Sequence, residues 1–198
     1  MTTAVRFDTD EDEPSPLQTL GLCDLSGLTK LGVKGRNAET WLSGQGVDVP
    51  ATIYESLPLG DGGLIVRLGT DEFLLESGLT DDDNGVAALS NRLDPTEEHV
   101  YRIERQDATF LLVGPRALDV LAQTCGVNFR EAAARYLVLM RVAGVSCGVF
   151  PASVGETQCY RLWVDYSYAA YLWETLEQIC NDLGGRVVGA GSLFPTIL

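Results

Sequence analysis

Side chains that commonly carry out nucleophilic or acid–base catalysis are sparse in this chain. The single histidine, His99, lies in a polar TEEHV stretch with no nucleophile motif around it. A Ser-His-Asp or Cys-His arrangement requires a histidine within hydrogen-bonding reach of its nucleophile. We therefore expect His99 to be a solvated loop residue and not a general base.

The cysteines also give no sign of a reactive or metal-binding site. There are five, an odd number, widely scattered and without a C-x-x-C pair: Cys23, Cys125, Cys147, Cys159 and Cys180. Such spacing argues against a disulfide framework. One histidine cannot complete a zinc ligand set with them. We expect buried structural thiols and no metal held by this chain.

Carboxylates and glycines are plentiful but lie in the wrong contexts for catalysis or dinucleotide binding. The acidic runs at residues 81–83 and 97–98 are contiguous and adjoin predicted helix ends, which indicates capping and solvation. Gly60, Gly62 and Gly63 precede a predicted strand, whereas a dinucleotide fingerprint follows one. Neither pattern predicts an active site.

Composition narrows the class of protein. A chain of 198 residues with 45% hydrophobic side chains can bury one sizeable core. Its net charge of −14 repels phosphate backbones and anionic lipid, which argues against nucleic acid or a membrane surface as partner. Because no apolar run approaches the roughly 20 residues that span a bilayer, and residues 1–20 read as an acidic flexible tail and not as a secretory signal, we expect a cytoplasmic location.

Two stretches of the chain repeat one pattern. Residues 31–47 read LGVKGRNAETWLSGQGV and residues 110–127 read FLLVGPRALDVLAQTCGV. In each, an apolar strand is followed by a glycine, Gly35 or Gly114, and then by apolar residues at helical spacing. A spacing of 79 residues between the two glycines predicts two similar halves of one domain.

The surrounding segments alternate in the same order in both halves. Strands are predicted at 62–68, 72–76, 100–103, 136–142, 145–150, 158–165 and 186–188, helices at 84–93 and 167–183, and irregular connections at 48–59 and 151–156. We predict an α+β fold of two pseudo-repeated β-α-β-β-α halves, about 28–95 and 100–188, in a single domain over 21–191. Its antiparallel sheets are packed with helices.

Two apolar features could serve packing or assembly. Aromatic residues gather where the last long strand meets the last long helix: Trp163, Tyr166, Tyr168, Tyr171 and Trp173. We interpret them as core residues, with a protein interface as the next candidate if part of the group is exposed. The apolar tail at 192–198 could dock on its own core or on a neighbouring chain.

Several of these stretches resemble a known family. RLGTDEFLLES (67–77), FLLVGPRALDVLA (110–122) and YRLWVDYSYAAYLWETL (160–176) follow the order of the folate-binding aminomethyltransferase fold, which includes the T-protein of the glycine cleavage system. Within it, LCDLSGLTKLGVKGRNAETWL together with GLIVRLGTDEFLLE most resembles the gamma subunits of heterotetrameric sarcosine oxidases. The resemblance covers about residues 21–191.

Departures from the T-protein pattern concern its folate site. An acidic pair precedes the LIV strand in the T-protein, whereas Gly62 and Gly63 stand there in this chain. The glutamate that grips the pterin is replaced by Arg161, which has no hydrogen-bond acceptor, and the preceding loop carries Glu156. The resemblance therefore implies that the fold is kept, that Glu156 and Arg161 are vestigial folate-site positions, and that the chain has no catalytic residue.

The resemblance also implies a function and partners. It implies a non-catalytic, gamma-type subunit of a complex that oxidatively demethylates sarcosine or a related N-methylated amino acid, within one-carbon metabolism. FAD, FMN, NAD, tetrahydrofolate and zinc would be bound by the partner chains, which are flavoprotein alpha and beta subunits and a small delta-type subunit. This chain would give them structural support.

Two alternatives stay open. The first is a stand-alone folate-dependent aminomethyl or C1 transferase with a site rebuilt around Glu156, Arg161 and Asp165. The second is an accessory factor of the same fold, for example in iron–sulfur cluster maintenance, although the reactive cysteine motif of those relatives is not found in this sequence.

Overall fold

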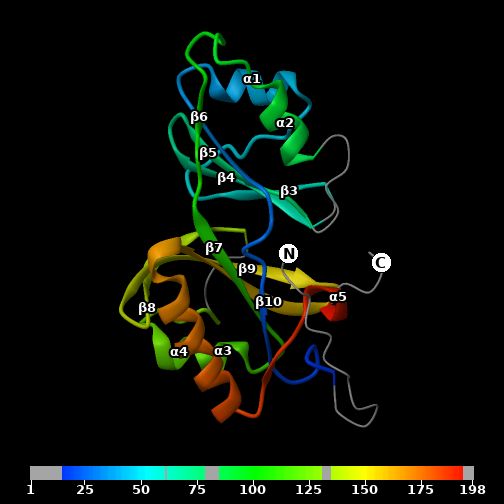
Figure 1. The fold of residues 1–198 in the computed structure, drawn as a ribbon, viewed down its shortest axis with the longest axis vertical. Helices are drawn as coiled ribbons and strands as arrows, with labels where there is room; N and C mark the ends of the chain where they lie inside the picture. Colours follow the sequence, from blue (N-terminus) through cyan, green and yellow to red (C-terminus); the bar gives the residue numbers. More distant parts are fainter. Residues whose placement is uncertain (1–14, 61, 79–84, 131–134, 194–198) are drawn as a thin grey trace.

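Two β-sheets are stacked in the middle of the molecule, and helices cover the outer face of each (Figure 1). The computed structural model describes residues 15–60, 62–78, 85–130 and 135–193. The strands are β1 (Gly21–Asp24), β2 (Lys30–Lys34), β3 (Ser56–Leu59), β4 (Gly63–Gly69), β5 (Glu72–Glu76), β6 (Tyr101–Ile103), β7 (Asp107–Val113), β8 (Val138–Val142), β9 (Val145–Val154), β10 (Thr157–Asp165) and β11 (Arg186–Val187). The helices are α1 (Ala38–Gly44), α2 (Val86–Arg92), α3 (Ala117–Thr124), the 3₁₀ turn η1 (Tyr166–Tyr168), α4 (Ala169–Asp182) and α5 (Ala190–Leu193). The predicted α+β class is confirmed.

The strand–glycine–helix repeat is present in both halves. Gly35 and Gly114 each adopt a positive φ, +128° and +98°, at the turn between strand and helix. The buried residues of the two helices occupy equivalent places: Ala38, Trp41 and Leu42 in α1, and Ala117, Val120 and Leu121 in α3. The same local pattern therefore buries the same helix face twice.

Successive side chains of a strand point alternately toward the helices and toward the other sheet. In β5, Phe73 and Leu75 pack against α1 and α2, whereas Leu74 faces the other sheet. In β10, Leu162 packs toward α3 and α4, whereas Trp163 faces the sheet that contains β5. Because successive strand residues point to opposite faces, each sheet buries one face under helices and the other in a seam between the two sheets.

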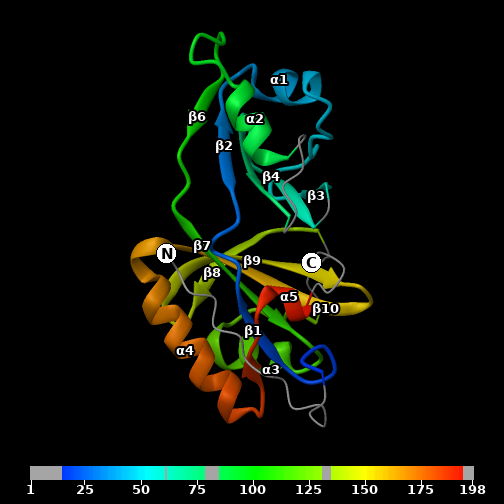
Figure 2. The same ribbon diagram turned by 45° about the vertical axis from the view of Figure 1, so that its right-hand side comes forward.

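The two sheets exchange a strand. The five-stranded sheet has the order β3-β4-β5-β2-β6, and the six-stranded sheet has the order β11-β1-β7-β10-β9-β8. Thus β1, which precedes β2 in the chain, pairs with β7, and β6, which precedes β7, pairs with β2. The chain crosses the seam in both connections, at residues 25–29 and 104–106, and Figure 2 shows them leading from one half to the other.

Two of the predicted irregular connections are partly strand. The segment predicted as a loop at 151–156 continues β9 to Val154, and β3 forms inside the stretch 48–59. Each contains a proline, Pro151 or Pro58, and a proline within an apolar run argues against a strand. The structure tolerates them because β3 is an edge strand and because β8 ends at the level of Val149, so β9 is an edge strand beyond it.

The core interpretation of the aromatic group is wrong for three of its members. Trp163 is buried and Trp173 packs on Phe110, but Tyr166, Tyr168 and Tyr171 are exposed. In the apolar tail, Leu193 is buried against the second sheet. The predicted helix start at residue 84, its acidic cap at 80–83, residues 1–14 of the acidic tail and residues 194–198 lie outside the described residues.

Candidate functional site

A buried carboxylate lies in the seam between the two sheets. Glu76 is the last residue of β5 and has no solvent-accessible surface. Because Leu74, two residues earlier, faces the seam, alternation also turns Glu76 toward the second sheet. Within the described part of the chain it is the one carboxylate in the buried class. An acid in this position needs donors from the protein.

Four side chains surround the Glu76 carboxylate. Arg161 Nη1 donates to Oε1 at 2.8 Å. Thr109 Oγ1 and Trp163 Nε1 donate to Oε2 at 2.5 and 2.9 Å, and Lys30 Nζ lies 3.4 Å from the same oxygen. The side chains of Lys30 and Arg161 are only 4% and 8% exposed. The carboxylate therefore joins β5 to β2 within its own sheet and to β7 and β10 across the seam.

Pseudo-symmetry explains why these residues meet. Lys30 and Thr109 each lie five residues before the glycine of their repeat. Lys30 is the strand partner of Glu76, and Thr109 is the strand partner of Trp163. The Lys30–Glu76 pair and the Thr109–Trp163 pair are thus equivalent in the two sheets, and they face each other at the centre of the seam.

Arg161 fills the space beside this centre. Its Nη2 donates to the Gly62 carbonyl at 3.3 Å, and its guanidinium lies 5.9 Å from the centroid of the Phe150 ring. Its Nε has no hydrogen-bond partner among the described residues. An arginine therefore stands, buried in the seam, at the position where the T-protein resemblance expects the glutamate that grips the pterin.

The arrangement does not fit a pterin held by Glu76. A carboxylate offers about four acceptor positions, and Glu76 already has Arg161, Thr109, Trp163 and Lys30 around it. The paired N–H groups of a pterin would have to displace buried donors, which would lose their own partner. The chemistry of this cluster is that of an internal ion-pair network.

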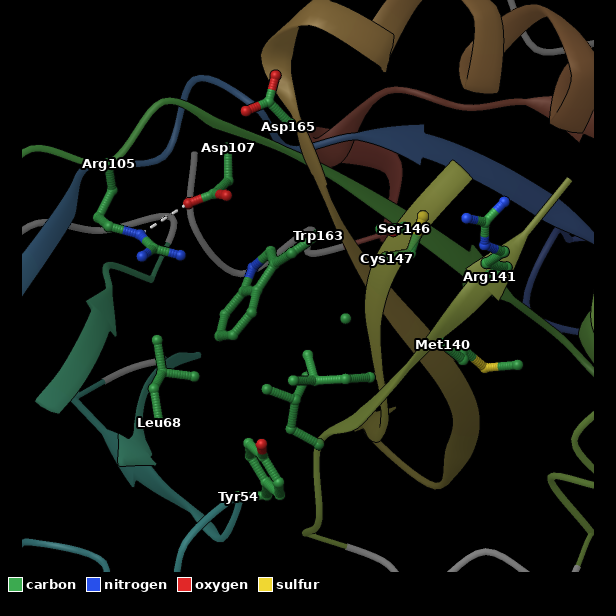
Figure 3. Close-up of a pocket in the computed structure, with 13 residues that line it drawn as sticks. Tyr54, Leu68, Arg105, Asp107, Met140, Arg141, Ser146, Cys147, Trp163 and Asp165 are labelled. Carbon is green, nitrogen blue, oxygen red and sulfur yellow. Dashed lines mark hydrogen bonds and ion pairs between the residues drawn. The ribbon is translucent and has the colours of Figure 1, made fainter. Parts of the chain in front are cut away.

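A cavity opens at the other end of the seam. It has a volume of about 660 Å³ and is lined by Tyr54, Leu68, Arg105, Asp107, Leu137, Leu139, Met140, Arg141, Ser146, Cys147, Gly148, Trp163 and Asp165. Figure 3 shows Trp163 from β10, Leu68 from β4 and Tyr54 from the loop before β3 around the space. Its walls thus combine apolar, aromatic and charged side chains and come from both sheets.

Charged groups of both signs also line this cavity: Arg105, Asp107, Arg141 and Asp165. Arg105 Nε donates to Asp107 Oδ2 at 2.9 Å (Figure 3). Asp165 Oδ1 accepts hydrogen bonds from the Ser167 hydroxyl and backbone N–H, and these bonds lower the pKa of its carboxyl group. Arg105 and Asp107 also line a neighbouring cavity of about 400 Å³. Because a lowered pKa favours the ionised form, Asp165 presents a negative charge beside the cavity.

The structure does not gather the three residues singled out for a rebuilt site. Glu156 lies in the turn between β9 and β10 and is exposed, Arg161 is buried in the seam, and Asp165 is exposed at the far end of β10. Nine residues of extended chain place Glu156 and Asp165 about 30 Å apart. Arg161 and Asp165 lie toward opposite ends of the seam, and only Asp165 lines the large cavity.

Glu76 is a buried residue of the seam that was not predicted from the sequence. Its position at the end of a hairpin strand, before Ser77 and Gly78, is typical of a solvated carboxylate. The available signal was the strand period, since Glu76 alternates with the apolar Phe73 and Leu75 and shares a face with Leu74. What buries it is the second sheet, and that contact has no local signature in the sequence.

The remaining candidates are the five cysteines and His99. Four of the five cysteines are buried and Cys125 is half-buried. His99 is half-buried, with Nε2 3.1 Å from Glu98 Oε1 and in contact with Arg36. Over the described ranges, no group of three histidine, cysteine or acidic side chains is arranged to hold a metal ion.

None of the helices in the described residues is both long enough and apolar enough to cross a bilayer.

Comparisons with known proteins agree on one superfamily. The family model described as the GCVT N-terminal domain matches residues 14–194. An aminomethyltransferase from Thermoanaerobacter pseudethanolicus (strain ATCC 33223 / 39E) is 20% identical over 184 residues, which is 87% of this chain and 50% of that protein. The chain thus spans about half the length of the curated relatives it matches.

Two solved structures share the fold. The glycine cleavage system aminomethyltransferase T from Bartonella henselae superposes with a TM-score of 0.69 at 20% identity, over 89% of this chain and 49% of that chain. A chain of the heterotetrameric sarcosine oxidase from Corynebacterium sp. U-96, in complex with pyrrole 2-carboxylate, superposes with a TM-score of 0.67 at 22% identity, over 87% of this chain and 89% of that chain. At these identities the likeness concerns the fold.

Proposed function

This chain belongs to the GCVT N-terminal domain family, and from that premise we propose that it is a non-catalytic, gamma-type subunit of a heteromeric, flavin-dependent oxidase of sarcosine or a related N-methylated amino acid. In this role it supports the flavoprotein subunits and binds no folate itself. FAD, FMN, NAD, tetrahydrofolate and zinc belong to the alpha, beta and delta-type partners.

The observation that carries this proposal is the saturated carboxylate. Glu76 is buried and already surrounded by Arg161, Thr109, Trp163 and Lys30. A folate-dependent transferase needs free acceptors for the pterin and a group that handles a proton on the bound substrate. In the seam the available acceptor is used to hold the two sheets together.

The extent of the structural match supports the same proposal. The match to the sarcosine oxidase chain covers nearly all of both chains, 87% and 89%. The matches to the aminomethyltransferases cover about half of those proteins. The chain thus corresponds to nearly all of the matched oxidase chain and to about half of each matched transferase.

Co-expression with the flavoprotein genes of its genomic neighbourhood tests the proposal. We expect the chain to elute with the flavoprotein subunits in size-exclusion chromatography, and the purified chain alone to give no heat of binding with tetrahydrofolate in calorimetry. A folded chain that ignores the flavoproteins and binds tetrahydrofolate would reject the proposal.

A folate-dependent C1 transferase is the second candidate, and the large cavity favours it. A volume of about 660 Å³ lies within the range of small-molecule sites, and Trp163 offers an aromatic wall. Heat of binding with tetrahydrofolate that is lost in Leu68→Trp, which fills the cavity, would support this candidate over an assembly role.

A further inference from the structure

The cavity of about 660 Å³ lies over a row of residues on one face of the six-stranded sheet. Leu139 on β8 pairs with Gly148 on β9, and Gly148 pairs with Trp163 on β10. Residues directly opposite each other in antiparallel strands point to the same face. A Cβ added to Gly148 would meet Leu137, Leu139 and Trp163 within 4 Å. The missing side chain therefore lets these three approach one another and form the apolar bottom of the cavity.

A second row, two residues away on each strand, carries charged side chains. Arg141 pairs with Ser146, and Asp165 pairs with Asp107. The ladder between β9 and β10 ends at the pair before Ser146 and Asp165, so these two are the next residues opposite each other. All four line the cavity. Because neighbouring strands lie about 4.8 Å apart, the Cα atoms of Arg141 and Asp165 are about 10 Å apart, with Ser146 between them. In the view of Figure 3, Arg141, Asp107 and Asp165 lie on the side of the cavity away from Tyr54.

Two of the four charges that line the cavity have no charged partner among the described residues. Arg105 and Asp107 neutralise each other, with Nε donating to Oδ2 at 2.9 Å. Arg141 donates to a backbone carbonyl at 3.3 Å and forms no ion pair in the described part of the chain. Asp165 accepts hydrogen bonds from Ser167, and these bonds hold the pKa of its carboxyl group below the usual value. The cavity therefore presents one cation and one anion to a ligand.

The aromatic walls of the cavity are fixed by the surrounding structure. The indole N–H of Trp163 donates to Glu76 Oε2 at 2.9 Å, and its ring packs edge-on against Phe150 with 5.0 Å between the centroids. Tyr54 has a φ of +70°, and its carbonyl accepts from the Leu137 N–H at 2.8 Å. Left-handed non-glycine residues cost energy and cluster at functional sites, ligand clamps among them. Rigid aromatic walls with a few placed charges are typical of small-molecule sites.

We propose that this cavity binds a free amino acid with an apolar side chain, with its carboxylate on Arg141, its ammonium on Asp165 and its side chain against Trp163. The guanidinium fork matches a carboxylate, and the long arginine stem lets one ligand reach both charges across Ser146. A ligand with only a negative charge would be repelled by Asp165, and one with only a positive charge by Arg141. The inference goes beyond the proposed function and holds whether or not the chain assembles with a flavoprotein.

Calorimetry on the purified full chain with three related ligands tests the inference. L-phenylalanine carries both charges, phenethylamine lacks the carboxylate, and 3-phenylpropanoate lacks the ammonium. We expect saturable heat with L-phenylalanine and binding about tenfold weaker or more for each of the other two, because each loses one charged hydrogen bond. Equal affinity for the three ligands, or no heat with L-phenylalanine, would overturn the inference.

Two variants assign the charges of the ligand to residues of the cavity. Asp165→Asn can keep the cap on Ser167 but removes the charge. We expect it to weaken L-phenylalanine binding by about tenfold and not to weaken that of 3-phenylpropanoate, which has no ammonium. Arg141→Gln should weaken L-phenylalanine binding and not that of phenethylamine, which has no carboxylate. Equal loss of all three ligands in both variants would mean that these residues support the fold without binding the ligand, and would overturn the inference.

Asp94→Asn is the matched control. Asp94 Oδ1 accepts from the Thr96 hydroxyl and backbone N–H at 2.7 and 2.8 Å, as Asp165 does from Ser167, and these bonds lower the pKa of its carboxyl group. Asp94 follows α2 and does not line the cavity. We expect this variant to bind L-phenylalanine as the unmodified chain does. A loss equal to that in Asp165→Asn would contradict the assignment of the ammonium to Asp165.

Leu68→Trp places the ligand in the cavity, because the larger side chain fills the space that Leu68 lines. We expect it to abolish the heat of L-phenylalanine binding while the thermal unfolding midpoint stays within a few degrees of that of the unmodified chain. Heat that persists in this variant would place the amino acid elsewhere and overturn the inference. Displacement of L-phenylalanine by tetrahydrofolate would assign the cavity to a folate and would also overturn it.

Discussion

Glu76 and Arg161 form a buried ion pair, and loss of Arg161 leaves the carboxylate with the more distant Lys30, at 3.4 Å, as its charged partner. Oε1 of Glu76 loses its closest donor if Arg161 is replaced by methionine, which keeps much of the volume. Breaking a buried pair in this way is strongly destabilising, because a desolvated charge remains. We expect Arg161→Met to lower the free energy of unfolding by about 3 kcal/mol, measured by urea denaturation with circular dichroism.

Lys34 provides the matched control for Arg161. Its ion pair with Glu72 joins the same strands as the Lys30–Glu76 pair, at 2.9 Å, but the two side chains are 55% and 30% exposed. Exposed pairs contribute little, so Lys34→Met should change the free energy of unfolding by less than about 1 kcal/mol. Equal effects of Lys34→Met and Arg161→Met would show that the seam network does not hold the sheets together.

Buried thiols make the stability of the protein sensitive to alkaline pH. Burial raises the pKa of Cys23 and Cys159 to about 12 and of Cys147 and Cys180 to about 11. In the unfolded chain the thiols ionise near pH 8.5. A raised folded-state pKa contributes stability that is complete below the unfolded value and is lost as pH rises through the folded value. We expect the free energy of unfolding to fall from about pH 9 toward pH 11, measured by urea denaturation across that range.

Alkylation checks the same assignment at a single pH. Thiolate is the reactive form of cysteine. At pH 8 we expect iodoacetamide to modify Cys125, which is half-buried, before the four buried cysteines, and to modify all five after unfolding in urea. Mass spectrometry of the intact chain counts the added groups. Rapid modification of Cys23 or Cys159 in the folded chain would contradict the burial assigned to them.

Single residues were only partly predictable from the sequence. Helical periodicity predicts that Ala38, Trp41 and Leu42 share one face of a helix, and all three are buried in the structure. Glu76 was missed because its burial depends on Arg161, 85 residues away in the chain. A period-2 pattern shows which face a side chain takes, but it cannot show that the opposite face of the sheet is covered.

At the scale of elements, the glycine of each repeat permits a sharp turn that a side chain would block. A Cβ on Gly35 would overlap the His99 carbonyl, and one on Gly114 would lie 2.6 Å from the Thr19 carbonyl. Both glycines also have a positive φ. We expect Gly35→Ala and Gly114→Ala each to lower the free energy of unfolding by about 2 kcal/mol or more, measured by urea denaturation.

Gly44 is the control within α1. A Cβ added there meets no atom within 4 Å, and its φ lies outside the left-handed range. Alanine is the better helix former, so Gly44→Ala should be neutral or stabilising by about 0.5 kcal/mol. A repeat glycine that tolerates alanine as well as Gly44 does would remove the structural reason for the repeat.

Elements with a local signature were predictable, and elements defined by a distant partner were not. The hairpin of β4 and β5 follows from the turn at residues 69–71, and the structure confirms it. The continuation of β9 past Pro151 was missed, because whether a strand tolerates proline depends on which neighbours it has. The exchange of β1 and β6 has no local pattern at all, since a short strand reads the same whichever sheet receives it.

At the scale of the whole molecule, strand exchange couples the two halves. Residues 25–29 and 104–106 cross the seam, and the backbone N–H of Leu25 donates to the carbonyl of Thr109 at 2.8 Å. Unfolding the N-terminal half of the chain would take β1 out of the six-stranded sheet, and unfolding the C-terminal half would take β6 out of the five-stranded sheet. Either event exposes the Glu76 cluster. We therefore expect the chain to unfold in one cooperative transition, although it is built from two similar halves.

The natural tryptophans measure this coupling. Trp41 lies on α1 over the first sheet and Trp173 on α4 over the second, where it packs 5.2 Å from the Phe110 ring centroid. The pairs of substitutions W163F/W173F and W41F/W163F leave one reporter in each half and share the loss of Trp163. Because the substitutions themselves change stability, the fluorescence curve of each variant is compared with the circular dichroism curve of the same variant. In both, we expect the fluorescence and circular dichroism curves to coincide in urea, because each half of the chain contributes a strand to the sheet of the other half. Fluorescence of one half changing at a lower urea concentration than the circular dichroism of the same variant would mean that the sheets unfold separately and that the exchanged strands do not couple them.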